Sequence, residues 1–292
     1  MACRAILRLA SVVLGIRPLV PVTERTSRTI PVVPRCPTVP VRVQGINSGT
    51  LRSRLLPVAL STLPQIDRLV LATVTAVPDW HSQHDTFEPF PVHAWLIRHP
   101  DGIILVDTGV GVGNEVIDEW YHPHTTPLLD ALGETGFAAS DIAAVVVSHL
   151  HFDHCGQQEV LTAPVYVQAS EFEAAQTPGY TVPDWAAIPD DRLRLVHGDE
   201  EIAEGISLLS TPGHSPGHQS VLVEAAGERV VIAAQCASRA AELRTGEPVA
   251  SECHDETWEV DARHSLERLR ALAPVTAHLS HDPEIVVFSG DT

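Results

Sequence analysis

The chain has 292 residues, of which 37 are acidic, 19 are basic and 16 are histidine. All 19 basic residues are arginine, which excludes mechanisms that need a lysine, such as Schiff-base formation or P-loop phosphate binding. A hydrophobic content of 44% with 19% charged residues is typical of a globular chain and excludes a disordered or collagen-like one.

The charge is distributed unevenly along the chain. Residues 1–54 hold nine arginines and one acid, whereas the remaining residues hold ten arginines and 36 acids. Such an acidic body repels phosphate backbones and suits divalent cations and neutral substrates. We therefore expect a small-molecule substrate and no nucleic-acid partner.

The five cysteines are scattered, at positions 3, 36, 155, 236 and 253, and none forms a C-x-x-C pair. This pattern favours a reducing compartment, so we expect a cytoplasmic protein. The apolar stretch Met1–Pro18 contains Arg8, which interrupts the hydrophobic run of a secretory signal, although an N-terminal targeting segment remains the alternative. No apolar run reaches the roughly 18 residues of a membrane span, and we expect no membrane partner.

Residues 1–40 contain six closely spaced prolines, which exclude a helix or a central strand. We expect this stretch to be a poorly ordered, Pro/Arg-rich extension. A single globular domain over residues 41–292 follows it.

Short or alternating apolar runs predict the strands of the first half of that domain, at Val41–Ile46, Leu69–Val74, Pro91–Ile97, Gly102–Val106, Ile142–Val147 and Pro164–Val167. The third and fourth of these form a predicted hairpin. The continuous apolar run Ile142–Val147 is typical of a strand buried on both faces. Helices are predicted at Thr125–Leu132 and from the cap Ser170 to Ala175, with Glu173 at the capping-box position.

The second half continues with predicted strands at Leu193–Val196, Ile206–Leu209, Ser220–Val223, Arg229–Ala233 and Val275–Leu279. A helix is predicted over Glu256–Leu272, with one apolar stripe made of Trp258, Val260, Leu266 and Leu269. Strands outnumber helices and often follow one another directly. This order predicts a mixed α/β (α+β) fold and not a doubly wound one.

Two loops carry residues that suggest binding. Gly109, Gly111 and Gly113 follow a predicted strand as in a dinucleotide loop, but Asn114 replaces the last glycine, which indicates a plain glycine turn. The loop from Trp80 to Phe90 is apolar enough to line an acyl pocket. It could equally cover the core.

The segment from Ser148 to Gly156 holds four metal-ligand residues in H-x-H-x-D-H order, directly after a buried strand. His149 and His151 project the same way from an extended end, whereas Asp153 and His154 lie on the following loop. This spacing suits two adjacent ions, one on each pair. Imidazole and carboxylate ligands suit zinc, and iron or manganese is also acceptable.

On these residues the chain resembles the metallo-β-lactamase superfamily over Val41–Asp282. Asp107-Thr108-Gly109 and the turn Thr211-Pro212-Gly213-His214 match further motifs of that family. The resemblance implies a four-layer αβ/βα sandwich, with His214 completing the first ion site and His281 completing the second. The run from Ser215 to Ser220 is similar to the branch that opens N-acyl homoserine lactones.

One ligand departs from the family pattern. Gln235 stands where the family has an aspartate that bridges both ions, so a neutral carboxamide replaces a carboxylate. We expect the second ion to bind more weakly and the enzyme to work with one ion or two. Cys236 is a substitute ligand or a small buried core residue. Ser238 occupies the place where the lactonase branch often has a tyrosine.

Other candidate residues have local interpretations. His218 orients a ligand or caps the adjacent strand. His278 faces away from His281, and Cys155 is expected to pack tightly and not to act as a nucleophile. The remaining histidines, such as His93, have no ligand spacing, which indicates surface or core positions.

The expected activity is metal-assisted hydrolysis of a lactone or ester, a quorum-quenching reaction if the lactonase resemblance holds. Asp153 is the predicted catalytic residue, because it can orient the attacking water and pass its proton to the leaving alkoxide. The alternatives are hydrolysis of a thioester or phosphoester on the same fold, and a weakly active metal-binding protein with a degraded second site.

Overall fold

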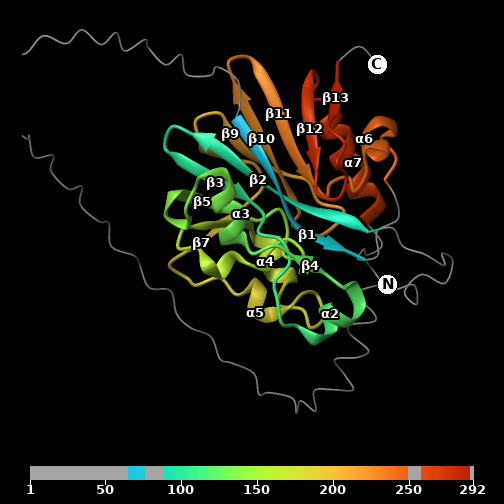
Figure 1. Cartoon of the computed structure of the whole chain (residues 1–292). Coiled ribbons are helices and arrows are strands. Elements are labelled where there is room, and N and C mark those ends of the chain that lie inside the picture. The colour runs from blue at the N-terminus through green and yellow to red at the C-terminus, as the bar shows by residue number, and fades with distance from the viewer. Residues whose placement is uncertain (1–64, 76–88, 249–257, 290–292) are drawn as a thin grey trace, which may run out of the picture. The chain divides into compact units, whose positions relative to one another are not determined.

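The computed structural model of the chain describes residues 65–75, 89–248 and 258–289. The expected extension over residues 1–40, the predicted strand Val41–Ile46 and most of the Trp80–Phe90 loop lie outside this part. All the described residues belong to one compact unit. Within that unit two β-sheets are stacked between layers of helices (Figure 1).

The first sheet, as far as the structure describes it, has seven strands in the order β4-β1-β2-β3-β5-β6-β7. The predicted hairpin is confirmed, since β2 and β3 pair antiparallel and His99 lies opposite Gly102. The predicted buried strand becomes β5, which lies between β3 and β6 and is parallel to both. The strands are β1 (Gln65–Val74), β2 (Phe90–His99), β3 (Gly102–Val106), β4 (His124–Thr125), β5 (Ile142–Val146), β6 (Val165–Gln168) and β7 (Leu193–Val196).

The second sheet has six described strands in the order β13-β12-β11-β10-β9-β8. The central pair β10 and β11 is antiparallel, whereas β11 and β12 are parallel. The strands are β8 (Glu200–Ala203), β9 (Ile206–Ser210), β10 (Gln219–Ala225), β11 (Glu228–Ala234), β12 (Val275–Leu279) and β13 (Val286–Phe288).

The described helices are short apart from the last one. Their bounds are α2 (Glu115–Tyr121), α3 (Leu128–Thr135), α4 (Ala169–Ala174), α5 (Pro183–Ala186), α6 (Ala240–Thr245) and α7 (Trp258–Arg270). Sequence reasoning predicted α3, α4 and α7 and missed the other three.

Three apolar clusters define the layers. The inner cluster joins the facing sides of the two sheets, with Trp95 and Ile97 of β2 packed near Ile232 of β11. A second cluster packs α3 on the outer face of the first sheet, and a third packs α6 and α7 on the outer face of the second. The fold is therefore the predicted αβ/βα sandwich, because each sheet buries one face against the other sheet and one against helices.

Three sequence predictions are corrected by the structure. Thr125 lies in β4, and α3 begins only at Leu128, because Pro127 takes the N-cap position. Helix α4 has Gln168 at its N-cap with no side-chain cap, so the predicted Ser170 cap is wrong. Val260 was expected on the buried stripe of α7, but its side chain is 58% exposed.

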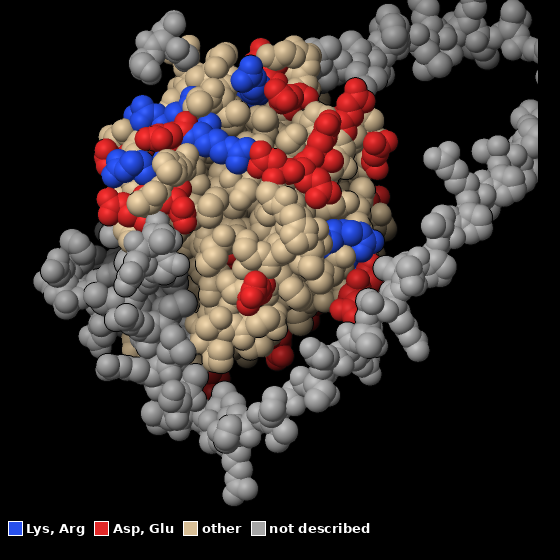
Figure 2. Space-filling model, turned by 180° about the vertical axis from the view of Figure 1, so that it is seen from behind, with Lys and Arg blue, Asp and Glu red and all other residues tan. Residues whose placement is uncertain are grey.

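On the face drawn in Figure 2, blue and red atoms lie next to one another mainly in the upper part, whereas tan atoms fill most of the centre. Described ion pairs of this kind include Arg263 with Glu247 and Arg244 with Glu284. None of the described helices combines the length and apolar content needed to cross a bilayer.

Candidate metal centre

The H-x-H-x-D-H segment leaves the carboxyl end of β5 as a buried loop. His149 and His154 are fully buried, and His151 and Asp153 are nearly so. The loop packs against the glycine turn after β3, where Gly156 N–H donates to Gly109 O at 2.8 Å. A Cβ on Gly156 would lie 1.9 Å from Gly111 N, so this close backbone contact requires glycine.

The first ligand set consists of three imidazoles, from His149, His151 and His214. His214 Nε2 lies 3.1 Å from His149 Nε2 and 3.1 Å from His151 Nδ1. Burial lowers the pKa of His149 and of His214 well below the ordinary value, and the neighbouring imidazoles lower them further. Neutral rings with nitrogens converging on one point are the arrangement that a divalent ion such as zinc accepts.

The second set consists of Asp153, His154 and His281. Asp153 Oδ2 lies 3.5 Å from His154 Nε2 and 3.4 Å from His281 Nε2. His281 donates its other ring N–H to Pro91 O at 3.0 Å, which directs Nε2 toward Asp153. Burial raises the pKa of Asp153, but His154 and His281 outweigh burial and lower it, so the carboxylate is ionised.

The carboxylate of Asp107 holds ligands of both sets. His154 Nδ1–H donates to Asp107 Oδ2 at 2.8 Å, so Nε2 is left to face the second set. Ser148 donates its hydroxyl to the same oxygen at 2.8 Å, and its Oγ lies 3.1 Å from His149 Nδ1. Asp107 therefore fixes the tautomer of His154 directly and orients His149 through Ser148.

Electrostatics favour a positive charge at the second set. Burial lowers the pKa of His154, but the carboxylates of Asp153 and Asp107 outweigh burial and raise it to about 10. Two buried carboxylates around one imidazole thus favour a cation at Nε2, either a proton or a metal ion. Both sets therefore fit divalent ions by their donor atoms and by their charge.

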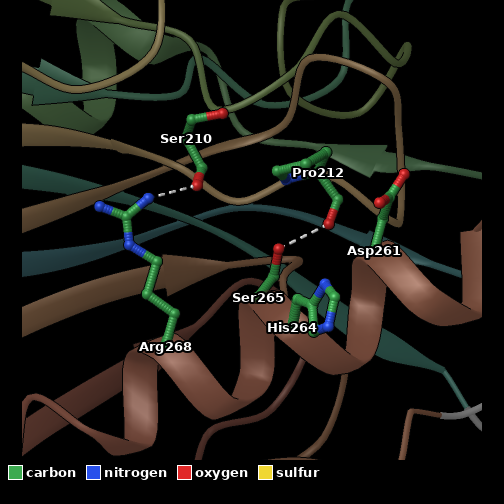
Figure 3. Close-up of a pocket in the computed structure, with 6 residues that line it drawn as sticks. All are labelled: Ser210, Pro212, Asp261, His264, Ser265 and Arg268. Carbon is green, nitrogen blue, oxygen red and sulfur yellow. Dashed lines mark hydrogen bonds between the residues drawn. The ribbon is translucent and has the colours of Figure 1, made fainter.

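The turn that carries His214 packs against α7. Figure 3 shows Ser265 donating its hydroxyl to Pro212 O and Arg268 donating to Ser210 O, at 2.7 and 2.8 Å. A Cβ on Gly213 would lie 2.5 Å from the Ala262 backbone, so the turn and the helix are in direct contact. The pocket between them is lined by none of the candidate ligands.

A family profile of the metallo-beta-lactamase superfamily matches residues 87–281, which include both ligand sets. The chain belongs to the metallo-beta-lactamase superfamily.

Within this superfamily the chain is similar to N-acyl homoserine lactonases. It is 34% identical over 164 residues to one from Bacillus sp, which covers 50% of this chain and 65% of the relative. A Bacillus cereus lactonase is 36% identical over 147 residues, or 46% of this chain and 58% of the relative. The chain thus matches less than two thirds of the length of these curated relatives.

The fold also matches solved structures of this kind. A structure of N-acyl homoserine lactone hydrolase, with the product N-hexanoyl-L-homoserine bound at its catalytic metal centre, has a TM-score of 0.64 and 25% identity. It covers 77% of this chain and is itself covered completely. A B. thuringiensis lactonase structure has the same TM-score at 24% identity and supports the fold.

Gln235 lies beside the second ligand set, at the end of β11. Its Oε1 is 3.1 Å from His154 Nε2, and its backbone N–H donates to His218 Nε2 at 3.2 Å. His218 also contacts Thr211 O through Nδ1 at 3.0 Å. His218 therefore connects the turn that carries His214 to the turn that carries Gln235.

Cys236 and Cys155 both pack in apolar clusters, as their core interpretation expects. Burial raises the pKa of both thiols, which disfavours a thiolate ligand or nucleophile. His278 is buried, and because its neighbours Ala277 and Leu279 pack toward α6 and α7, it faces the other side of the sheet. His93 is a core residue that contacts Leu279 O at 3.0 Å.

Sequence reasoning missed Ser148 and Glu171. Ser148 gave a weak signal, since a hydroxyl stands immediately before the first ligand histidine. Glu171 gave none, because its sequence position is that of an ordinary residue in the first turn of α4. Its side chain is completely buried.

Proposed function

We propose that this protein is a metal-dependent hydrolase that opens the ring of N-acyl homoserine lactones. Two facing ligand sets in a buried, mostly histidine-lined centre carry the proposal. The similarity of about half the chain to N-acyl homoserine lactonases supports the substrate class.

In this proposal His149, His151 and His214 hold the first ion, and Asp153, His154 and His281 hold the second. Zinc suits these nitrogen and carboxylate donors, and iron or manganese is accepted by the same set. A bound divalent ion supplies Lewis-acid polarisation of the carbonyl and a water of lowered pKa. Gln235 adds a neutral oxygen beside the second set, so we propose that its ion binds more weakly.

In this proposal Asp153 is the catalytic proton carrier. Its ionised carboxylate can accept a hydrogen bond from the attacking water and orient it toward the lactone carbonyl. The carboxylate would take a proton from this water as the water adds to the carbonyl, and would pass that proton to the alkoxide that leaves when the ring opens.

An apolar cluster next to the ligands suits the acyl chain of such a substrate. Phe152 lies between two ligand residues of the loop and packs on Tyr121, with ring centroids 4.4 Å apart. Phe90 packs on the ring of the ligand candidate His281, with ring centroids 5.0 Å apart. Both phenylalanines belong to the cluster that includes Val92 and Ile117.

A second candidate function follows from Gln235. A protein that retains the first ion but has lost the bridging carboxylate could bind metal with little hydrolytic activity. Metal content and activity separate these functions, because this alternative predicts an occupied first site without turnover of lactones, thioesters or phosphodiesters.

The direct test replaces one ligand of the first set. His149→Ala is expected to abolish lactone hydrolysis and to remove about one ion per chain in elemental analysis. His197→Ala is the matched control, since His197 is exposed and lies in neither ligand set. Full activity of His149→Ala would contradict the proposal.

A further inference from the structure

Glu171 is a completely buried carboxylate in α4 that accepts four hydrogen bonds. Its Oε1 accepts from Leu150 N–H at 2.8 Å and from the Tyr180 hydroxyl at 2.5 Å. Its Oε2 accepts from the Ser215 hydroxyl at 2.7 Å and from Gly217 N–H at 3.0 Å. A buried charge is tolerated only where hydrogen bonds replace its hydration, and here both oxygens have two donors.

These donors come from the two loops that carry the first ligand set. Leu150 stands between His149 and His151, whereas Ser215 directly follows His214. One carboxylate therefore connects the first two histidines of the H-x-H-x-D-H loop to His214, which lies 63 residues beyond His151. This connection joins the two chain segments that carry the three imidazoles.

The packing around Glu171 is close as well as polar. A Cβ on Gly217 would lie 2.2 Å from Glu171 N, so the turn after His214 lies directly against α4. The ring of Tyr180, whose hydroxyl donates to Glu171, packs on His151 with centroids 4.9 Å apart. Tyr180 thus contacts both the Glu171 carboxylate and the ring of His151.

A carboxylate suits this position better than a carboxamide. The backbone N–H groups of Leu150 and Gly217 can only donate, and they approach opposite oxygens. A glutamine at residue 171 would direct its NH2 group toward one of these two N–H groups. Two facing donors cannot form a hydrogen bond, so one loop would lose its attachment.

We propose that Glu171 is a positioning residue that sets the geometry and the affinity of the three-histidine ion site. It acts through Leu150, Ser215 and Gly217 and touches neither ion nor substrate. This inference rests on the proposed metal centre but is independent of the substrate.

The test measures cobalt(II) binding in the full chain with His281→Ala as background, so that the three-histidine set dominates the signal. Glu171→Gln is expected to weaken cobalt affinity about 10- to 100-fold in chelator competition. It is also expected to change the visible absorption spectrum of bound cobalt, because the ligand geometry changes. Glu173→Gln, an exposed change in the same helix, is expected to change neither.

Wild-type cobalt affinity and spectrum in Glu171→Gln, with only a lower melting temperature, would overturn the inference and leave Glu171 a purely structural role. If Glu171→Gln fails to fold, Ser215→Ala decides, since it removes a single donor. Its cobalt affinity is expected to fall by up to about tenfold, and an unchanged affinity would overturn the inference. Cobalt binding without any lactone hydrolysis by the unaltered chain would contradict the proposed function only.

Discussion

Asp107 occupies an unusual backbone conformation at the end of β3. Its φ of 63° lies in the left-handed region, which asparagine and aspartate tolerate better than most residues. The conformation directs one carboxylate toward His154 and Ser148, and through Ser148 toward His149. Backbone strain of this kind persists where the surroundings fix it, and here the fixed feature is the orientation of two ligands.

Asp107→Asn is expected to weaken metal binding about 10- to 100-fold, with the larger effect at the second site. The two Asp107 oxygens now accept from different donors, Oδ1 from the Ser148 backbone N–H and Oδ2 from the His154 ring and the Ser148 hydroxyl. A carboxamide has one acceptor oxygen, so its NH2 group would face one of these donors. Chelator competition with elemental analysis measures this change. Asp101→Asn in the exposed β2–β3 turn is the control, and equal affinities in the two variants would contradict the role of Asp107.

The neutral side chain of Gln235 lies beside the second ligand set. The amide oxygen of Gln235 lies 3.1 Å from His154 Nε2, and Gln235→Asp would put a carboxylate, one methylene shorter, on the same side of the second ligand set. We expect occupancy of the second site to rise, because a carboxylate can bridge two cations and neutralise their charge. Metal stoichiometry measures it, with the exposed Gln176→Asp as the charge-matched control. An unchanged stoichiometry would show that Gln235 does not contact the second ion.

At the scale of elements, two glycines with different surroundings test the contact between the H-x-H-x-D-H loop and the glycine turn after β3. Gly156→Ala is expected to destabilise the fold by about 2 kcal/mol or more and to lower metal content, because its Cβ would clash with Gly111 N. Gly133→Ala in α3 meets no atom within 4 Å. It should stabilise the fold by about 0.5–1 kcal/mol, since alanine favours a helix.

Urea unfolding of the two variants measures both free energies. Equal stabilities of Gly156→Ala and Gly133→Ala would contradict the close contact between the ligand loop and the glycine turn.

Sequence patterns predicted the elements that have a clear apolar pattern and missed several whose local signal is weak or was misread. The hairpin, β5 and β7 follow from local apolar patterns. Helix α2 was missed because Asn114 was considered only as a failed glycine motif, whereas its side chain caps α2 through Val116 N–H and Ile117 N–H. The short strands β8 and β13 pair at the edges of the second sheet, and their sequences carry little apolar alternation.

The candidate site shows the same division. His149, His151, Asp153 and His154 are close in sequence, so their spacing alone indicated metal ligands. Glu171 could not be predicted, because its partners in the His214 turn come close only after the two sheets have stacked. The family resemblance placed His214 and His281, which the spacing did not.

At the scale of the whole molecule, the two sheets meet beside the candidate metal centre. His93 N–H of β2 donates to Ser280 O after β12 at 3.0 Å, and His281 donates to Pro91 O. The first sheet supplies the H-x-H-x-D-H loop, whereas the second supplies His214 and His281. The centre therefore forms only when the sandwich is assembled, and a bound ion should stabilise the whole fold.

Buried histidines make this assembly sensitive to acid. Burial, with smaller contributions from Arg68 and His93, lowers the pKa of His278 from 6.5 to about 4. In the unfolded chain His278 therefore takes up a proton below about pH 6.5, whereas in the folded chain it does so only below about pH 4. Stability from this group is present above pH 6.5 and is lost as the pH falls toward 4, by at most about 3 kcal/mol.

We expect the metal-free His278→Gln variant to lose less stability than the unaltered chain between pH 6.5 and 4. Urea unfolding across this range measures the difference. Parallel curves for the two proteins would show that His278 takes up no proton on unfolding.

Removing and restoring the metal tests most directly whether this protein is a metal-dependent lactonase. The unaltered chain is treated with a chelator, dialysed and reloaded with zinc, and hydrolysis of an N-acyl homoserine lactone is followed at each stage. We expect activity to disappear with the metal and to return on reloading with at least one ion per chain. Hydrolysis that persists in the metal-free chain, or a reloaded chain that hydrolyses no lactone, would contradict the proposed function.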